Sequence, residues 1–361
     1  MAFSHQTLGQ RVSFGVGNTA SDLAGEVERF AESTGAPQRV MLIAAESAGD
    51  TAAEAASGLP VVHSHRGAAR HVPLEDAQAA RVEAQRSEAD LLVAIGGGSA
   101  VGLAKAVALT HRLPIIAVPT TYSGSEGTNI WGMTEAGTKT TGADDFVLPA
   151  AVVYDAELVR DLPADLTVAS GLNALAHSID GLWAPGANPI NTAWAGEAMR
   201  ALSEGLPKVA SDPRASEPGR QQMQYGAYLS AVAFASTGSA LHHKICHALG
   251  GAFNLPHAET HAVVLPYVLA FNAPEARSAA ERIAEAFGAE DPVEGLMALR
   301  AAIGAPGALR DHGLDEADLD RAAELVLAAA PSSNPRPVSA SDARRIVRAA
   351  WAGEDPAALS R

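Results

Sequence analysis

The chain has 361 residues, 47% hydrophobic and 19% charged, which excludes a disordered protein and allows two domains with a large core. Acidic residues outnumber basic ones by 41 to 26, and the resulting net charge of −15 argues against nucleic acid as a partner. Because the single cysteine, Cys246, excludes an internal disulfide and no signal peptide or membrane-spanning apolar run is visible, we expect a cytoplasmic protein without membrane contacts.

Strand-like and helix-like segments alternate in the first part of the chain, up to Tyr154. Continuous apolar runs such as 39–45 suit parallel strands that are covered on both faces. Their alternation with helices predicts a doubly wound parallel α/β domain, which we place at residues 1–161. Strands are expected at 12–14, 39–45, 61–65, 90–95, 114–118 and 150–154, and helices at 21–34, within 46–60, at 75–88 and at 99–111, with Ser21 and Ser99 as N-caps.

The pattern changes after Leu162, where helical spacing continues and no strand pattern recurs. We therefore expect an all-helical domain at residues 162–361, with the boundary near Asp161–Pro163. Ser339 and Asp342 resemble a capping box at the start of the last helix. The expected helices cover 164–183, 191–207, 219–237, 240–249, 275–287, 293–303, 315–329 and 341–352.

Five of the 12 histidines lie within residues 242–261. His243 and His247 are four residues apart and would share one face of a helix, which we expect to end at Gly250–Gly251. A following loop, fixed by Pro256, would aim His257 at the same point. Histidine titrates near neutral pH and is a common metal ligand, so the group predicts a functional site, although any one of them could be a packed core histidine.

Upstream, Asn173 and His177 are also four residues apart and could add an amide and a further imidazole from a second helix. Cys246 lies between two of the histidines and could be a nucleophile or a metal ligand. We favour a buried small hydrophobic residue for Cys246, since free cysteines are among the most buried side chains.

A glycine turn, made of Gly96, Gly97, Gly98 and Ser99, follows a predicted buried strand and opens a helix. Glycines let backbone N–H groups approach a pyrophosphate, and a helix N-terminus adds partial positive charge. The turn fits neither the Rossmann fingerprint nor the P-loop, and it could also be an ordinary strand-to-helix turn. We interpret it as a phosphate-binding turn.

Hydroxyl groups follow the next strand, where Thr120, Thr121 and Ser125 lie in segment 119–126. Ligands of open α/β sheets bind at the carboxyl ends of the strands, so these hydroxyls could hold phosphate, ribose or a nicotinamide amide. A turn rich in serine and threonine is the alternative. Glu46, which ends the 39–45 strand, is either an acceptor for a ribose or a solvated loop carboxylate.

Four segments together resemble the iron-containing alcohol dehydrogenase superfamily, and within it the maleylacetate reductases. They are the glycine turn, Pro119–Thr121, Gly171–His177 and His243–His257. The resemblance runs from Arg11 to about residue 270, and it implies the two-domain fold that dehydroquinate synthases share. It also implies NADH or NADPH as cofactor and a homodimer. Cofactor contacts are further expected from Lys139 and Leu158.

Metal-dependent members of this superfamily carry an aspartate where this chain has Asn173, and histidines at positions 177, 243 and 257. An amide oxygen is a weaker ligand for a divalent ion than a carboxylate. Although three histidines alone can hold zinc, we expect no metal. Should a metal bind, its ligands would be His177, His243 and His257.

The resemblance implies that NADH or NADPH reduces the C=C bond of maleylacetate, a dianion, to 3-oxoadipate in aromatic-compound catabolism. We expect His243 to be the main donor or general acid and His247 to lie beside the nicotinamide. His177 and Asn173 would orient the substrate, and protonated His243 or His257 would stabilise the developing oxyanion.

Three questions stay open at this point. Lys244 and His242 are candidate partners for the substrate carboxylates, although Lys244 could simply face solvent. The chain could instead be a metal-dependent alcohol dehydrogenase acting on another small alcohol or aldehyde. A non-catalytic nucleotide-binding protein on the same fold is the remaining alternative.

Overall fold

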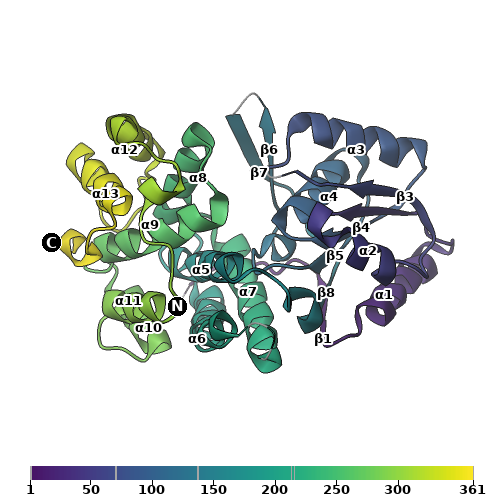
Figure 1. The fold of residues 1–361 in the computed structure, drawn as a ribbon, viewed down its shortest axis with the longest axis horizontal. Helices are drawn as coiled ribbons and strands as arrows, with labels where there is room; N and C mark the ends of the chain where they lie inside the picture. The colour runs from purple at the N-terminus through teal and green to yellow at the C-terminus, as the bar shows by residue number, and fades with distance from the viewer. Residues whose placement is uncertain (1, 70, 136–137, 213, 215, 361) are drawn as a thin grey trace. The chain divides into compact units, whose positions relative to one another are not determined.

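The structure is a computed structural model, and it describes residues 2–69, 71–135, 138–212, 214 and 216–360. The side chains of Thr138 and Lys139 lie outside this description. The chain divides into two units, a sheet unit formed by Thr7–Leu162 and a helical unit that begins at Pro163 and includes the residues before Thr7 (Figure 1). Within the described ranges, no helix has both the length and the apolar character that a bilayer-crossing segment requires.

A six-stranded sheet forms the centre of the sheet unit, with the strand order β1-β8-β5-β4-β2-β3. Every neighbouring pair in it is parallel, which confirms the predicted doubly wound α/β fold. All six strands were predicted: β1 (Arg11–Gly15), β2 (Val40–Ala44), β3 (Val61–Arg66), β4 (Leu91–Gly96), β5 (Ile115–Pro119) and β8 (Ala151–Asp155).

Both faces of the sheet are buried, because alternate side chains of each strand pack against different helices. In β4, Leu92 and Ala94 join the core beneath α3 (Leu74–Arg86) and α4 (Gly98–His111). Leu91 and Val93 join the other core, beneath α1 (Thr19–Thr34) and α2 (Gly49–Ala55). The helices of the sheet unit are drawn on both faces in Figure 1. This two-sided burial explains why the inner strands β2, β4, β5 and β8 are buried at every position, whereas the edge strands β1 and β3 are partly exposed.

Two predicted N-caps are wrong. Ser21 lies inside α1, whose N-cap position is Asn18, and Ser99 lies inside α4, whose N-cap position is Gly97. At the start of α1 the carboxylate of Asp155, from β8, accepts the first helical N–H group at 3.1 Å. A capping group from another strand leaves no trace in the local spacing, so sequence could not identify it.

An antiparallel hairpin of β6 (Ile130–Glu135) and β7 (Thr138–Ala143) was not predicted. The segment lacks a continuous apolar run, and its threonines and glycines resemble a loop. In the hairpin, Gly142 pairs with Trp131. A Cβ atom on Gly142 would lie 2.6 Å from the Trp131 ring, so glycine is needed for this cross-strand contact.

The helical unit contains no strand among its described residues, as predicted. The capping box of Ser339 and Asp342 at the last helix is confirmed. The α-helices are α5 (Ala164–Gly181), α6 (Pro189–Ser211), α7 (Glu217–Thr237), α8 (Leu241–Phe253), α9 (His257–Asn272), α10 (Arg277–Phe287), α11 (Pro292–Ala302), α12 (Leu319–Ala329) and α13 (Ala340–Ala352).

Helices α5 and α9 form the core of the helical unit. Every residue of α5 from Thr167 to Gly181 is buried, as is every residue of α9 from Thr260 to Asn272. A Cβ atom on Gly171 would lie 2.7 Å from Met223 of α7, so α5 packs there through its backbone. A polar side chain on either helix is therefore enclosed by protein on most sides.

The predicted end of α8 and the predicted loop after it are both wrong. α8 continues through Gly250–Gly251 to Phe253, and Asn254 ends it with a left-handed φ of 52°. Glycine ends a helix when it takes that left-handed conformation, and here the asparagine takes it instead. His257 is consequently not in a loop but is the first residue of α9, directly after Pro256.

Candidate active site

One face of α5 carries Asn173, His177 and Asp180, which follow one another at intervals of four and three residues. Asn173 is 2% exposed, His177 8% and Asp180 not at all. Buried polar groups such as these need partners, since an unpaired buried polar group is costly. The partners of Asp180 lie on α8.

Asp180 binds the start of α8 and its first histidines. Its carboxylate accepts the backbone N–H groups of Ala240 at 2.9 Å, His242 at 3.1 Å and His243 at 3.3 Å. The Nδ1 atom of the His243 ring lies 2.8 Å from Asp180 Oδ2. The N-cap residue of α8 is Ala240, whose side chain cannot accept a hydrogen bond from the first turn. Asp180, from a different helix, therefore caps α8.

The several N–H donors define Asp180 as an acceptor and therefore as an ionised carboxylate. His243 must then carry its first ring proton on Nδ1, pointing at Asp180. The other ring nitrogen, Nε2, is buried and has no hydrogen-bond partner among the described residues. Asp180 thus orients His243 so that Nε2 is the nitrogen available to a ligand.

Aromatic rings hold His243 in place from two further helices. The His177 ring stacks on it with centroids 5.0 Å apart and an angle of 13° between planes. The Phe234 ring of α7 lies 4.2 Å from His243 and 4.7 Å from His177. Rings from α5, α7 and α8 thus form one packed group in which His177 Nδ1 is also buried without a partner among the described residues.

Burial lowers the pKa of His243 well below its ordinary value, and the neighbouring His247 and Lys244 lower it further. Burial and the nearby His243 likewise lower the pKa of His177, against the opposing effect of Asp180. Both rings are therefore neutral at neutral pH before a ligand binds. The protonated His243 expected from the sequence is disfavoured in this state.

His247 and His257 extend the group towards solvent. His247 lies one turn after His243 on α8, with ring centroids 6.2 Å apart, and His257 lies 6.2 Å from His247. His247 is partly buried and His257 is exposed. The structure therefore links four predicted catalytic histidines through successive ring contacts, with Asn173 one turn before His177 on α5.

The two candidate partners for substrate carboxylates differ in exposure. Lys244 is exposed on α8, in agreement with the solvent-facing alternative. His242 is fully buried, and its Nε2 lies 2.9 Å from Nδ1 of His261 on α9. Its position makes His242 a poor partner for a substrate carboxylate. Cys246 is also buried, with Sγ 3.7 Å from His242 Nε2.

In the sheet unit, the predicted cofactor-binding residues follow the carboxyl ends of adjacent strands. β5, β4 and β2 are neighbours in the sheet, with Gly96 paired to Pro119 and Ala44 paired to Ile95. Glu46 follows β2, the glycine turn follows β4, and the threonines follow β5. Residues that are up to about eighty positions apart in the sequence thus meet at one edge, where open α/β sheets bind ligands.

The glycine turn lies directly against the hydroxyl segment. A Cβ atom on Gly97 would be 2.9 Å from Thr121 Cγ2, and one on Gly98 would be 3.3 Å from Ser123 Oγ. Gly96 has φ of 151° and would direct a Cβ atom into Ala45. Thr121 Oγ1 is buried without a partner among the described residues. The turn is therefore a close-packed backbone cradle, which suits a pyrophosphate.

Thr120 donates its backbone N–H to the Gly96 carbonyl at 3.1 Å, so the two segments are hydrogen-bonded. Ser125 begins the short helix η2 (Ser125–Gly127). Glu46 is exposed, and Leu158, in η4 (Ala156–Val159), packs against the core beneath α1. Lys139 pairs with Thr134 in the hairpin, and its predicted cofactor contact lies outside the described side chains.

Sequence reasoning assigned no role to Lys105, in α4, or to Glu126, the last residue of the hydroxyl segment, and both side chains are buried. Lys105 Nζ donates to the carbonyls of Ser125 at 2.6 Å and Thr128 at 2.8 Å. Burial lowers its pKa to about 7, while Glu126 raises it. Burial raises the pKa of Glu126, which accepts the Tyr154 hydroxyl at 2.7 Å. These side chains fix the segment that carries the predicted cofactor hydroxyls.

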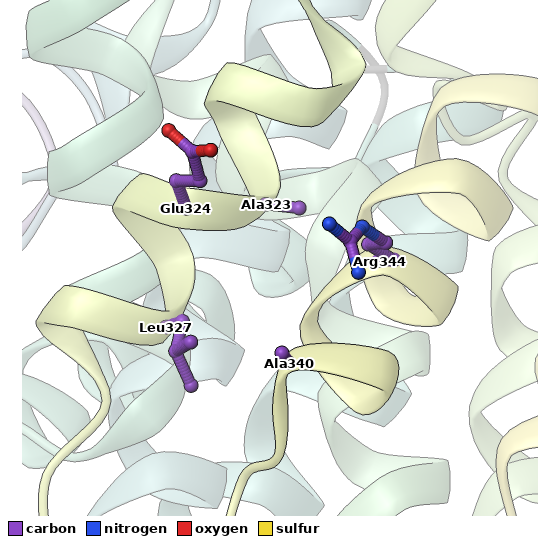
Figure 2. Close-up of a pocket in the computed structure, with 5 residues that line it drawn as sticks. All are labelled: Ala323, Glu324, Leu327, Ala340 and Arg344. Atoms are coloured by element: carbon purple, nitrogen blue, oxygen red, sulfur yellow. The ribbon is translucent and has the colours of Figure 1, made fainter.

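Asp180 was missed as well, although the sequence contained a signal. It lies three residues after His177 on a helix that was predicted, so a search for carboxylates on the same helical face would have found it. Its contact with His243 could not be found in this way, because the two residues are 63 positions apart. A hollow between α12 and α13, lined by Ala323, Glu324, Leu327, Ala340 and Arg344 (Figure 2), contains none of the predicted site residues.

Comparison with known proteins identifies the class to which these two arrangements belong. Residues 10–156 match the iron-containing alcohol dehydrogenase model, and residues 167–351 match the model of the C-terminal part of the Fe-containing alcohol dehydrogenase family. The chain belongs to the iron-containing alcohol dehydrogenase family and is an oxidoreductase.

Within this family the chain is similar to maleylacetate reductases. It is 43% identical over 358 residues to the maleylacetate reductase of Pseudomonas sp. strain P51, covering 99% of both chains. The crystal structure of maleylacetate reductase from Agrobacterium tumefaciens superposes with a TM-score of 0.91 at 37% identity, covering 99% of this chain and 100% of that one. An iron-containing alcohol dehydrogenase structure from Corynebacterium glutamicum gives 0.95 at 52% identity, covering 100% and 99%. The resemblance inferred from the motifs is confirmed.

The residues at the positions expected for a metal fit an iron ion poorly. Asn173 offers a neutral amide where a carboxylate would balance the charge of the ion. Among the described residues, the ligand atoms of His177, His243 and His257 do not form a group within 4.8 Å, whereas those of His242, Cys246 and His261 do. The family description names iron, which is at odds with our expectation of no metal.

Proposed function

We propose that this protein reduces the C=C bond of maleylacetate to 3-oxoadipate with NADH or NADPH. The observation that carries the proposal is the buried Asp180–His243 pair within the histidine group, in a chain 43% identical to a maleylacetate reductase. The pair provides an oriented proton-transfer group, which reduction of a C=C bond conjugated to a ketone requires. A non-catalytic nucleotide-binding protein would have no use for it.

The fit of a dinucleotide rests on the sheet edge. Gly97 and Gly98 lie so close to Thr121 and Ser123 that side chains on them would fill the cradle, and a pyrophosphate needs that backbone approach. Thr120, Ser125 and Glu46 would contact the remaining polar groups of the cofactor. When bound, the reduced nicotinamide supplies the hydride.

Addition of hydride to the carbon β to the ketone places negative charge on the ketone oxygen as an enolate. N–H donors that are already oriented stabilise such charge without reorganisation. The Asn173 amide and the His177 ring, one turn apart on α5, are suited to bind this oxygen. The enolate then needs one proton at the neighbouring carbon to give 3-oxoadipate.

His243 supplies that proton from Nε2. The negative charges of the substrate favour the protonated ring, and Asp180, 2.8 Å from Nδ1, stabilises it. After the transfer the neutral ring still donates its Nδ1 proton to Asp180. Nε2 then regains a proton from solvent. This sequence is consistent with the low pKa of His243 in the absence of ligand, because substrate binding charges the ring only when it is needed.

The dianionic substrate also needs positive charge near its carboxylates. α9 begins at His257 with its first N–H groups outside the helical hydrogen-bond pattern, and a helix N-terminus favours anions. Lys244, exposed on α8, can add a mobile charge. We propose that one carboxylate binds at the start of α9, beside the exposed His257.

We further propose that the reaction needs no metal, because neutral amide and imidazole groups replace the carboxylate that would balance a divalent ion. The rival is a metal-dependent alcohol dehydrogenase. It is favoured by two buried nitrogens without a partner among the described residues, His177 Nδ1 and His243 Nε2. It is also favoured by the Asp180 contact, because a metal-bound histidine commonly donates its other ring N–H to a carboxylate.

The remaining parts of the proposal concern cellular context. We propose a cytoplasmic homodimer that acts in aromatic-compound catabolism on a small dianion, without nucleic acid or membrane as partner. The net charge of −15 supports the exclusion of nucleic acid, and the lone cysteine supports a reducing compartment, whereas the homodimer and the catabolic role rest on the family resemblance. A local positive pocket is then needed to admit an anionic substrate.

The test is NADH and NADPH oxidation with maleylacetate, with and without a strong chelator, after elemental analysis of the purified protein. We expect 3-oxoadipate as product, at the same rate in chelator, from protein without stoichiometric iron or zinc. Reduction of simple aldehydes instead, abolished by the chelator and restored by iron or zinc, would establish the rival. Fumarate, which lacks the ketone, serves as the control substrate and should not be reduced.

A further inference from the structure

A separate group of ligand atoms lies beside the proposed reaction site, formed by His242, Cys246 and His261. His242 and Cys246 are four residues apart on α8, and His261 belongs to α9. His242 Nε2 lies 2.9 Å from His261 Nδ1 and 3.7 Å from Cys246 Sγ, and all three ligand atoms lie within 4.8 Å of one another. None of these residues has a role in the proposed reduction.

The spacing is close to that of a metal site. A tetrahedral zinc ion with ordinary Zn–N and Zn–S bonds places neighbouring ligand atoms about 3.3–3.6 Å apart. The separations of His242 Nε2 from His261 Nδ1 and from Cys246 Sγ, 2.9 and 3.7 Å, differ from these values by less than the movement that one side-chain rotation provides. The backbone of α8 and α9 therefore already brings the ligands together.

Charge and burial favour a soft cation. The three side chains are at most 2% exposed, so a bound ion would lose its water and depend on the ligands themselves. A thiolate would neutralise part of its charge, and one thiolate with two imidazoles suits Zn²⁺ or Cd²⁺ better than iron. Asn173, His177 and His243 provide no such anionic ligand.

We propose that His242, Cys246 and His261 form a binding site for a soft divalent cation, Zn²⁺ or Cd²⁺. On binding, the Cys246 thiol loses its proton to solvent, and the sulfur and two ring nitrogens bind the ion. The hydrogen bond between the two rings is replaced. The ring that donated it transfers its single proton to its other nitrogen, so that both ligand nitrogens are deprotonated and both rings stay neutral.

The proposed cation site lies beside the proposed proton donor, since the rings of His242 and His261 lie 5.1 and 4.9 Å from the His243 ring. Binding of the cation does not depend on the proposed function, and it is therefore measured without substrate or cofactor.

The experiment is a Cd²⁺ titration followed by the ultraviolet thiolate-to-cadmium charge-transfer band. Because Cys246 is the only cysteine of the chain, the band reports this site alone. We expect the band to saturate at one equivalent of Cd²⁺, and Zn²⁺ to compete with it. Absence of the band at excess Cd²⁺ overturns the proposal, whatever the outcome of the maleylacetate assay.

Three variants separate a three-residue site from a lone thiolate. Cys246→Ser should abolish the band, and His261→Gln should keep the thiol but weaken Cd²⁺ binding by more than about 100-fold. His63→Gln, in β3 of the sheet unit, is the matched control and should bind as the unchanged protein does. Equal affinity in His261→Gln and His63→Gln would overturn the proposal. Melting temperatures of all variants verify that they are folded.

Discussion

The helical unit and the sheet unit present their predicted ligand-binding groups in different ways. In the helical unit, a buried charge orients a buried ring, as Asp180 does for His243. In the sheet unit, glycines bring the backbone itself to the ligand, as Gly97 does against Thr121. A side-chain site is sensitive to the loss of one proton or one charge, whereas a backbone cradle is sensitive to one added carbon atom.

The largest effect is expected from removal of the proton donor in the helical unit. His243→Ala should lower kcat for maleylacetate by about 100- to 10,000-fold, the range for loss of a general acid. NADH affinity, measured by fluorescence titration, should stay nearly unchanged, because the cradle belongs to the sheet unit. Unchanged turnover would exclude the role assigned to His243.

Asp180→Asn tests the orienting charge with almost no change in shape. The amide oxygen can still accept some of the N–H groups of α8, but the NH2 group that replaces the other oxygen cannot accept any. The neutral amide also cannot stabilise a protonated His243 as a carboxylate does, so kcat should fall by about 100-fold or more. A helix cap alone would change the melting temperature and leave kcat intact. Kinetics measured well below the melting temperature distinguish these two outcomes, and a normal kcat would leave Asp180 only the capping role.

In the sheet unit, Gly97→Ala should raise KM for the cofactor by about tenfold while kcat at saturation changes little. The reason is the added Cβ atom, which would lie 2.9 Å from Thr121 Cγ2 and push the cradle open. The double variant Gly97→Ala with Thr121→Ser removes that methyl group and should recover part of the affinity. If KM for maleylacetate changes instead, the cradle does not bind the cofactor.

The smallest effect concerns Lys105, whose folded pKa of about 7 is below its ordinary value because of burial. A lowered lysine pKa means that the unfolded chain binds more protons between that value and the ordinary one, so stability should rise with pH across this window. Lys105→Met should remove this rise in the melting temperature. An identical pH dependence in both proteins would show that Lys105 keeps its ordinary pKa.

The secondary structure of the sheet unit could be predicted because its signals are local. A strand buried on both faces must be apolar at every position, and β2 and β4 meet this condition. The β6–β7 hairpin escaped prediction because it is not buried in this way. In the helical unit, α8 was predicted but its end was not, since left-handed Asn254, rather than the glycine pair, ends the helix.

The part of the candidate site that could be predicted is the part that residue types and their spacing along the chain reveal. Histidines four residues apart on α8, and an amide with a histidine on α5, can be read from the chain. Asp180 was overlooked, and its role depends on a contact with His243 across 63 positions. The protonation of His243 depends on burial, which no local pattern reports.

By itself, the sequence determined the six parallel strands, most of the helices, the glycine turn and the grouping of histidines, because periodicity and backbone chemistry act over a few neighbouring residues; the β6–β7 hairpin and α9 were not predicted. Only the tertiary structure decided which nitrogen of His243 is available and which lysine supports the hydroxyl segment. It also brought His261 beside His242 and Cys246. These outcomes depend on the desolvation and pairing of side chains from separate elements, and those energies exist only once the chain is folded.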